Sequence, residues 1–419
     1  MNGFNELAIN GGVPTRASPF PVWPQFETGE IEAAATVLRS GRVNYWTGEQ
    51  GRSFEDEFAT LMHCKHAVVV ANGSVGLELA LYALGIGPGD EVIVTSRSFI
   101  ASAACILLRG ATPVFADVDR ETQNITAESI GPVLSSRTRA IIAVHLAGWP
   151  CDMDSITEIA RERGIAVVED CAQAHGAKYK GRPVGSLGDI ASFSFCQDKI
   201  MSTGGEGGMV VTNNSDLWEK VWSFKDHGKN HRLMKELHCS GAFRWVHDSV
   251  GTNFRLTEMQ SAIGRVLLQK LIHAVEARRR NAGMLTSEFS AICGLRVTNT
   301  PPEIYHSYYK YYVFVRPECL APAWSRDRIM ESIRAEGVPC FTGGCSEIYL
   351  ETAFSSHGSR RARLPVAKEL GETSLMFLVH PTLTSEDIAD TCSAVRKVMT
   401  QALNGANTTG AVSSHAVSR

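Results

Sequence analysis

Residues 192–208 have the sequence SFSFCQDKIMSTGGEGG, in which a short apolar run leads to Lys199. Four of the five residues from 204 to 208 are glycine, which allows positive φ and a close approach of the backbone to a bulky ligand. A lysine that leaves water at such a place loses its proton more easily and can attack an aldehyde. The alternative interpretation is a surface lysine beside a flexible glycine turn.

Short apolar runs alternate with helical patterns on both sides of this stretch, from about residue 66 to 215. Such alternation predicts parallel strands joined by helices. The predicted strands are 67–70, 91–94, 113–115, 140–145, 165–168, 190–195 and 208–212. The last two are close enough in sequence to pair antiparallel. We therefore predict an α/β fold with a mostly parallel seven-stranded sheet between helices, and ligands at the carboxyl ends of its strands.

The pattern changes after residue 256. Residues 257–287 keep a helical period that is long enough for a connecting helix. Residues 288–403 mix helices with a few strands, such as 311–315, and predict a smaller α+β domain. Residues 404–419 are rich in small polar side chains, which predicts a disordered tail. The predicted large domain is therefore 1–256.

The composition excludes several kinds of protein. With 41 basic and 44 acidic side chains the formal net charge is -3, which leaves no positive excess for a nucleic acid. The run Arg278-Arg279-Arg280 is expected on the solvent face of a helix. Eleven cysteines without a CxxC pair predict reduced thiols and no metal site. We find no signal peptide and no membrane-spanning run, so the cytoplasm is the expected compartment.

Asp170 stands at the carboxyl end of a predicted buried strand, in the segment EDCAQAHG (169–176). A carboxylate there can pair with a protonated ring nitrogen, the interaction that makes pyridoxal phosphate (PLP) an electron sink. The alternative is an aspartate that caps a helix N-terminus. The spacing of 29 residues to Lys199 (199 − 170) favours the cofactor interpretation.

A phosphate site is predicted where Gly73 and Ser74 join the first strand to a helix. Free backbone N–H groups and the helix dipole at such a turn attract a phosphate. The signal is weak alone, because every α/β protein has such turns. No nucleotide fingerprint competes with it, since GIGPG at 85–89 lacks the GxGxxG spacing and no Walker sequence is present.

Together these segments resemble the DegT/StrS-type sugar aminotransferases, PLP enzymes of the aspartate aminotransferase superfamily. The resemblance extends from about Gly12 to Ala394. Its most specific segment, FSFxxxKxxxTGGEGG, is matched by residues 193–208. EDCAQAHG, the Gly73-Ser74 turn and GTNFRLTEMQ (251–260) support it. The resemblance implies PLP as the cofactor and the type I fold of PLP enzymes.

The resemblance also implies the residues that carry the chemistry. Lys199 would hold PLP as a Schiff base and then move the proton between substrate carbon and cofactor. Asp170 would pair with the pyridine nitrogen, and Gln173 would lie near the ring hydroxyl.

Further residues are implied to bind the cofactor from its edges. Gly73, Ser74 and Ser194 would hold the phosphate. Phe99 would stack on the cofactor ring, with plain core packing as the alternative. Asn253 in this family reaches the phosphate across a dimer interface, so the implied enzyme is a homodimer with composite sites.

The sequence departs from the family pattern at a few positions. Cys196 stands where many members have histidine, which could alter the wall that faces the substrate. Residues 340–349 lack the histidine-tyrosine-proline segment of many relatives, and the two cysteines in that segment are expected to be ordinary thiols. His145 either lines the pocket or is structural. A radical dehydratase branch has histidine in place of the lysine, and Lys199 argues against that branch.

The implied reaction moves an amino group from an amino acid, most often glutamate in this family, to a keto sugar carried on a nucleotide. The amino sugar would serve surface glycans or natural products. Alternatives are an aminotransferase for a cyclitol or another non-nucleotide ketone, and a non-catalytic PLP-binding regulator. A nicotinamide-dependent oxidoreductase is disfavoured by the missing fingerprint. The sugar, the nucleotide, the ring position and the choice of glutamate or glutamine stay open.

Overall fold

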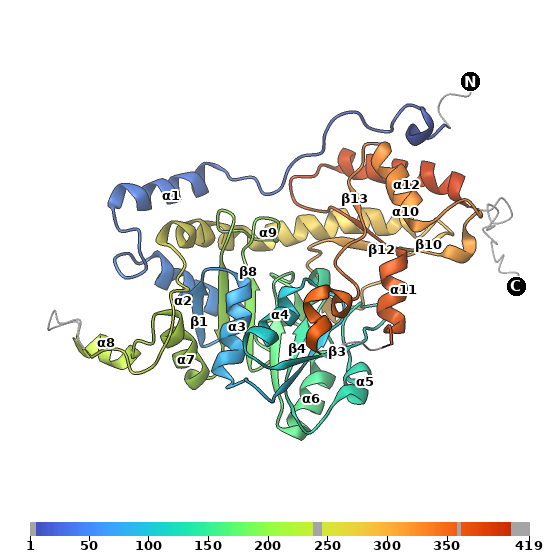
Figure 1. The fold of residues 1–419 in the computed structure, drawn as a ribbon. Coiled ribbons are helices and arrows are strands. Elements are labelled where there is room, and N and C mark those ends of the chain that lie inside the picture. The colour runs from blue at the N-terminus through green and yellow to red at the C-terminus, as the bar shows by residue number, and fades with distance from the viewer. Residues whose placement is uncertain (1–5, 238–244, 358–361, 404–419) are drawn as a thin grey trace, which may run out of the picture.

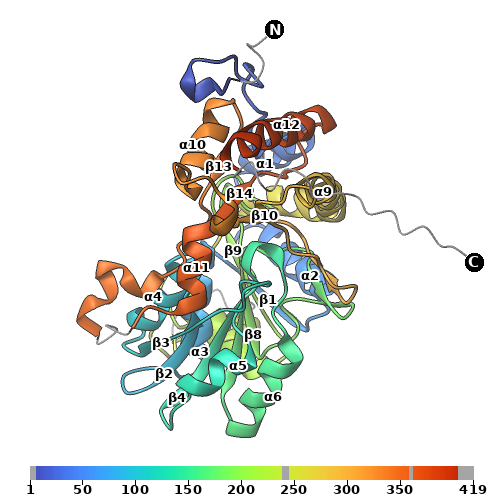
Figure 2. The same cartoon turned by 90° about the vertical axis from the view of Figure 1, so that its right-hand side faces the viewer.

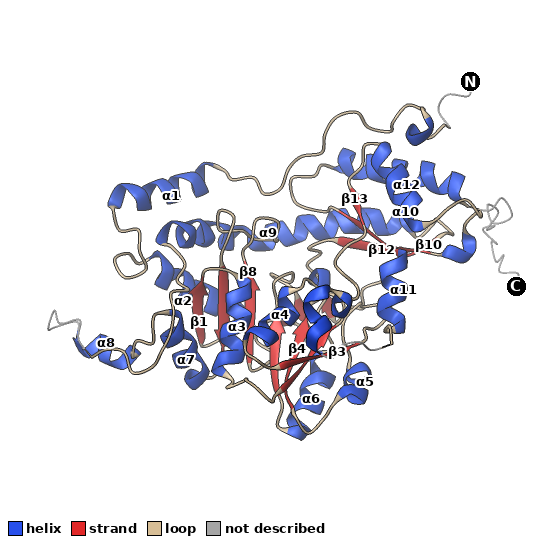
Figure 3. Ribbon diagram, in the orientation of Figure 1, coloured by secondary structure: helices blue, strands red, loops and turns tan. Residues whose placement is uncertain are grey.

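A computed structural model of the chain describes residues 6–237, 245–357 and 362–403 (Figure 1). The predicted tail, 404–419, lies outside the described residues. The large sheet and its helices form one part of the molecule, and a smaller sheet with its own helices forms another (Figure 3). The carboxyl ends of the large sheet's strands and the segments that reach them define the candidate site.

The large sheet has seven strands. They are β1 (His66–Val70), β2 (Glu91–Thr95), β3 (Thr112–Ala116), β4 (Thr138–Val144), β5 (Ala166–Asp170), β8 (Ile190–Ser194) and β9 (Gly208–Thr212). Their order is β1-β9-β8-β5-β4-β2-β3, and β9 runs antiparallel to both neighbours while the remaining pairs are parallel. The predicted mostly parallel sheet is confirmed, and so is the antiparallel pairing of the strands predicted at 190–195 and 208–212.

Helices cover both faces of this sheet. One face packs on α3 (Gly73–Ala83), α4 (Ala101–Leu108) and α7 (Ser215–Lys225). The other packs on α2 (Gln50–Met62), α6 (Met153–Arg163) and α9 (Glu258–Phe289). Neighbouring strand residues point to opposite faces, so that Val168 contacts the first layer and Val167 the second. Burial on both faces explains why the strands are nearly continuous apolar runs.

The smaller sheet is antiparallel. Its order is β10 (Leu295–Arg296), β12 (Tyr311–Val315), β14 (Ser374–Phe377) and β13 (Cys340–Phe341). Helices α10 (Arg326–Ala335) and α12 (Ser385–Ala402) share its core, and α11 (Pro365–Thr373) packs between it and the large sheet. The strand predicted at 311–315 is confirmed as β12. The remaining short elements are α5 (Ala127–Ile130), α8 (His231–Leu237), β6 (Lys178–Tyr179), β7 (Arg182–Pro183) and β11 (Ile304–Tyr305).

The long helix α9 runs past the large sheet into the smaller part, as Figures 1 and 2 show from two sides. Thr257 begins it with a capping box to Gln260. Helix α1 (Thr28–Ser40) packs along α9. Before α1, residues 6–27 run from the core of the smaller part, where Leu7 is buried, toward the large sheet. This N-terminal segment therefore links the core of the smaller part to α1, which packs on α9.

One prediction about α9 is wrong. Of the basic run expected on its solvent face, only Arg280 is exposed, while the Arg278 side chain is 1% exposed. Arg278 lies on the side of α9 that faces Trp23 and Tyr309. A run of charges marks an exposed helix face only where no other segment covers it, and here the N-terminal segment does.

Within the described ranges, no helix combines the length and the apolar character that a membrane crossing requires. The ten cysteines in these ranges are free thiols. Cys340 is buried in β13, whereas Cys345 is exposed.

Candidate active site

Lys199 lies in the connection from β8 to β9, five residues after Ser194. Its side chain is only 14% exposed, so the alternative of a surface lysine is wrong. The ammonium stands 4.9 Å over the ring of Tyr309 and 3.8 Å from Oδ1 of Asp198. Trp23 of the N-terminal segment donates its indole N–H to the Lys199 carbonyl at 2.8 Å. The lysine is therefore enclosed by segments that are far away in the sequence.

Asp170 is the last residue of β5 and is 4% exposed. Oδ2 accepts a hydrogen bond from the Ser102 hydroxyl at 2.7 Å, and Oδ1 accepts from the Ala172 amide at 3.1 Å. Burial raises the pKa of Asp170, and the hydrogen bonds and the nearby charge of Lys199 oppose that rise. Within the described ranges no cation forms an ion pair with Asp170. A buried carboxylate of this kind calls for a cationic ligand group.

The alternative of a helix-capping aspartate is also wrong. Residues 171–176 form turns, and no helix begins after Asp170. The Ala172 hydrogen bond belongs to a local turn, and the other carboxylate oxygen accepts from Ser102.

The neighbouring Glu169 has a different environment. Its carboxylate accepts from the amides of Gly185, Leu187 and Gly188 at 2.7–2.8 Å, and it lies 3.0 Å from Nε2 of His145. These partners lower the pKa of Glu169 against the effect of burial. His145 is fully buried and accepts from the Cys151 amide at Nδ1, which places the ring proton on Nε2. Of the two interpretations left open for His145, the structural one fits.

The Gly73-Ser74 turn lies against the end of β8. Asn72 caps α3 by accepting from the Val75 amide at 3.0 Å, and the first N–H groups of a helix have no acceptor within it. A Cβ on Gly73 would come within 2.7 Å of the Ser194 Cβ. Ser194 in turn faces Gly208 across the β8–β9 pair. The structure thus brings Gly73 and Ser194 together from positions 121 residues apart (194 − 73), as a phosphate site requires.

Replacing Gly73 with alanine is expected to weaken PLP binding by about tenfold or more, because the new methyl group displaces Ser194 or the helix start. Gly283 in α9 is the matched control, since a Cβ there meets no atom within 4 Å and its φ is not positive. Titration of both variants with PLP, followed by absorbance, measures the effect. Equal affinity in the two variants would contradict the assignment of Gly73 to the phosphate site.

The remaining predicted residues stand around these groups. Gln173 accepts from the Ala147 amide at 2.8 Å through Oε1. Phe99 is 66% exposed, so the alternative of plain core packing is wrong. Asn253 is exposed and accepts from the Arg255 amide at 3.3 Å. In the single chain, Phe99 and Asn253 are available to other partners.

Sequence reasoning missed three residues that touch the site: Ser102, Tyr309 and Trp23. Ser102 lies in the first turn of α4, which follows β2 in the chain, so its position just after a strand carried a signal. Tyr309 donates a hydrogen bond to Asp198 and faces Lys199. Neither Tyr309 nor Trp23 has a local pattern that marks it, because each reaches the site only through the tertiary fold.

The residues fit PLP in three respects: an enclosed lysine, a buried carboxylate without a cation, and a tight turn at a helix start. Lys199 would hold the cofactor aldehyde, Asp170 the ring nitrogen, and the Gly73–Ser194 turn the phosphate. The sheet and this arrangement define the class of PLP-dependent enzymes with the type I fold.

The chain belongs to the DegT/DnrJ/EryC1/StrS aminotransferase family, whose model matches residues 24–396. Members of this family use PLP. The predicted family, cofactor and enzyme class are therefore confirmed.

Known proteins extend the comparison. A GDP-perosamine synthase from Escherichia coli O157:H7 is 34% identical and covers 84% of this chain and 92% of its own length. A putative L-glutamine:3-amino-2,3-dideoxy-scyllo-inosose aminotransferase from Streptoalloteichus tenebrarius is 38% identical, and the match covers 80% of this chain and 79% of the relative. The X-ray structure of an aminotransferase from Psychrobacter cryohalolentis has a TM-score of 0.90 and 51% identity, and the match covers 92% of this chain and 100% of the other chain.

Proposed function

We propose that this aminotransferase moves an amino group from an amino acid, most often glutamate in related enzymes, to a keto sugar carried on a nucleotide. The product would be an amino sugar for a surface glycan or a natural product. The observation that carries the proposal is the enclosed Lys199 beside the buried Asp170, in a chain that is 34% identical to a GDP-perosamine synthase over 84% of its length.

The residues divide the work. When bound, PLP supplies the electron sink that stabilises negative charge at the substrate carbon. Asp170 keeps the proton on the ring nitrogen, because its buried carboxylate gains most by pairing with a cation. The Lys199 Nζ takes the proton from the donor α-carbon and returns one to the acceptor carbon in the reverse half. Tyr309 and Trp23 limit the entry of water around Lys199.

We also propose a homodimer, in which Asn253 of one chain reaches the phosphate site of the other. Phe99 and two large apolar residues within eight positions of Asn253 in the sequence, Trp245 (87% exposed) and Val250 (86% exposed), support it, because they are side chains that a partner chain would cover. We also propose four segments: a large domain (1–256), a connecting helix (257–287), a small domain (288–403) and a tail (404–419). A cytoplasmic location is part of the same proposal.

A cyclitol ketone is the second candidate acceptor. The relative from Streptoalloteichus tenebrarius supports it, since it is 38% identical over 80% of this chain. The cofactor residues serve either acceptor, because Lys199, Asp170 and Gly73 act on groups that both reactions share. The choice depends on the space beyond the cofactor and on the partner chain.

The test is an assay of amino product with glutamate or glutamine as donor and a panel of ketones as acceptors. Nucleotide-linked 3-keto and 4-keto sugars are expected to exceed a cyclitol ketone by about 100-fold in kcat/KM, since a built polar subsite discriminates strongly. A preference for the cyclitol would establish the second candidate. If the enzyme reacted with the amino donor but aminated none of the ketones, both candidate functions would be contradicted.

A further inference from the structure

A pocket of about 360 Å³ opens beside Lys199, between the N-terminal segment, α9 and the smaller sheet. Its apolar wall includes Trp23, Phe341 and Leu378. Its charged side chains are Asp198, Arg278 and Lys310. We call it the Arg278 pocket. A volume of this size, with apolar walls and a few polar groups, is typical of small-molecule sites.

Arg278 has an unusual hydrogen-bonding state. Nη1 donates to the Tyr309 carbonyl at 3.1 Å, which fixes the guanidinium, and the guanidinium stands 5.1 Å over the Trp23 ring. Nε and Nη2 are buried and have no acceptor. These two nitrogens lie on one edge of the guanidinium and present parallel N–H groups, the geometry that binds a carboxylate through both oxygens. A buried charge with an empty donor edge costs free energy until an anion satisfies it.

Lys310 adds a second cation to this pocket. Its Nζ stands 4.8 Å over the Tyr309 ring, and within the described ranges no carboxylate lies at ion-pair distance from it. Asp198 is the only acidic side chain of the pocket lining and accepts from Tyr309. Because Asp198 also lies 3.8 Å from the Lys199 ammonium, it cannot balance both Arg278 and Lys310, and the pocket keeps a positive charge that suits an anionic ligand group.

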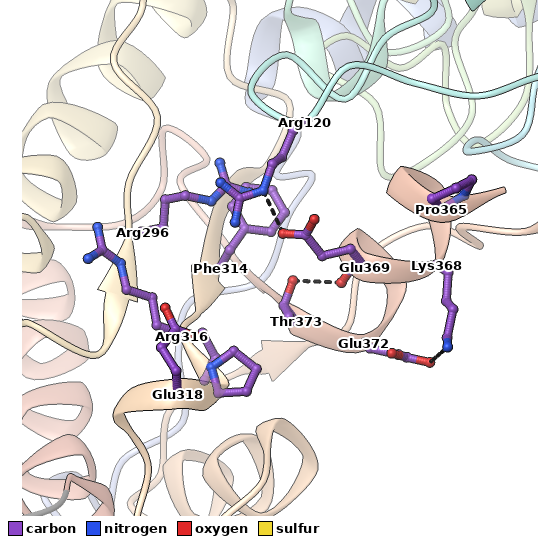
Figure 4. Close-up of a pocket in the computed structure, with 12 residues that line it drawn as sticks. Arg120, Arg296, Phe314, Arg316, Glu318, Pro365, Lys368, Glu369, Glu372 and Thr373 are labelled. Atoms are coloured by element: carbon purple, nitrogen blue, oxygen red, sulfur yellow. Dashed lines mark hydrogen bonds and ion pairs between the residues drawn. The ribbon is translucent and has the colours of Figure 1, made fainter.

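A larger pocket of about 530 Å³ provides a contrast (Figure 4). There Arg120 pairs with Glu369 at 2.6 Å, and Lys368 lies 3.9 Å from Glu372. Arg296 pairs with Glu121 at 3.0 Å. Within the described ranges, three of the four cations of that pocket, all but Arg316, have a carboxylate partner, whereas no ion pair is formed there by Arg278 or Lys310.

We propose that the Arg278 pocket binds a carboxylate of the amino donor, with the Nε/Nη2 edge of Arg278 and the Lys310 ammonium as its donors. The inference rests on the proposed function, because it places the donor next to Lys199. A diphosphate carries at least two negative charges and would face Asp198, so the acceptor's phosphates fit this pocket less well. Arg278 and Lys310 are specificity-determining residues in this account.

The direct test uses glutarate, which has two carboxylates and no amino group, and isothermal titration of the full-length chain. Lys310→Gln and Arg278→Gln are expected to weaken glutarate binding by about tenfold or more, since each removes a buried charged partner. Arg280→Gln is the matched control, because Arg280 lies exposed on the same helix. Thermal denaturation identifies any variant that fails to fold. If Arg278→Gln fails to fold, Lys310→Gln still provides the test, because Lys310 is only half-buried.

The two half-reactions separate the donor from the acceptor. Relative to the wild type, we expect Lys310→Gln to raise the KM for glutamate about tenfold. The rate at which the pyridoxamine form reacts with its ketone should change by less than about threefold. If only the ketone half-reaction changes, the pocket serves the acceptor and the inference is wrong. It is also wrong if glutarate binding is unaffected. Either result leaves the proposed function itself standing, which depends on amination of the ketone.

Lys310 also gives the pocket a pH dependence. Burial lowers the pKa of Lys310 to about 8; Asp198 opposes this, while Arg278 and Lys199 add to it. The Tyr309 hydroxyl and His380 also face the pocket, and burial lowers the pKa of His380 to about 3, which keeps it neutral. Lys310 therefore loses its charge as the pH rises through about 8. Glutarate affinity should fall above this pH in wild type and fall less in Lys310→Arg; parallel profiles would contradict the role of Lys310.

Discussion

Replacing Lys199 with alanine is expected to remove the lysine-dependent absorbance band of bound PLP and to lower turnover by at least about 10³-fold. The reason is that one Nζ both holds the cofactor aldehyde and moves the substrate proton, so the variant loses a nucleophile and an acid/base group together. Absorbance spectra of the purified chain with PLP, before and after addition of glutamate, measure the first effect, and product formation measures the second.

Lys310→Gln is the informative comparison for this result. Lys310 lines the Arg278 pocket and faces the same Tyr309 ring as Lys199, and its lowered pKa makes it the rival nucleophile among the described residues of that pocket. The account predicts that Lys310→Gln keeps the cofactor band and that Lys199→Ala loses it. The opposite pattern would assign the cofactor link to Lys310, and a band that survives in both variants would exclude both lysines.

Asp170→Asn is expected to lower kcat by about 10²- to 10³-fold while the fold is kept. Asparagine preserves the size of the side chain and its hydrogen bond to Ser102 but cannot pair with a protonated ring nitrogen. Loss of one partner of a buried ion pair costs about 3–5 kcal/mol, of which each 1.4 kcal/mol corresponds to a factor of ten. Steady-state kinetics and the PLP dissociation constant measure the effect.

Ser102→Ala separates the role of the charge from that of the hydrogen bond. This change removes a neutral partner of Asp170 at 2.7 Å, which is worth about 1 kcal/mol, so a loss of about fivefold is expected. If Ser102→Ala and Asp170→Asn had equal effects, the charge of Asp170 would not be what the cofactor requires.

The residues proposed to hold the cofactor stand out in the sequence because each lies in a short segment at the end of a strand. Lys199, Asp170 and the Gly73-Ser74 turn follow apolar runs, and the topology of a parallel sheet brings strand ends to one edge. Gly73 carries an additional constraint, since the close approach to Ser194 leaves no room for a side chain. Local pattern and global fold agree at these positions.

The substrate side of the site could not be predicted in the same way. Trp23 bonds to Lys199 across 176 residues, and Tyr309 faces it across 110 (309 − 199). No periodicity marks such contacts, because they depend on how the N-terminal segment and the smaller sheet pack on α9. The solvent position predicted for Arg278 is wrong for the same reason, because the N-terminal segment covers it and leaves it buried with two of its donors unused.

The most direct test of the account is to reduce the enzyme–PLP complex with borohydride, digest it and locate the phosphopyridoxyl group by mass spectrometry. The account predicts one modified peptide, with the group on Lys199 and none on Lys310. Modification of Lys310 in place of Lys199, or of neither lysine, would contradict the assignment of Lys199 as the residue that holds the cofactor.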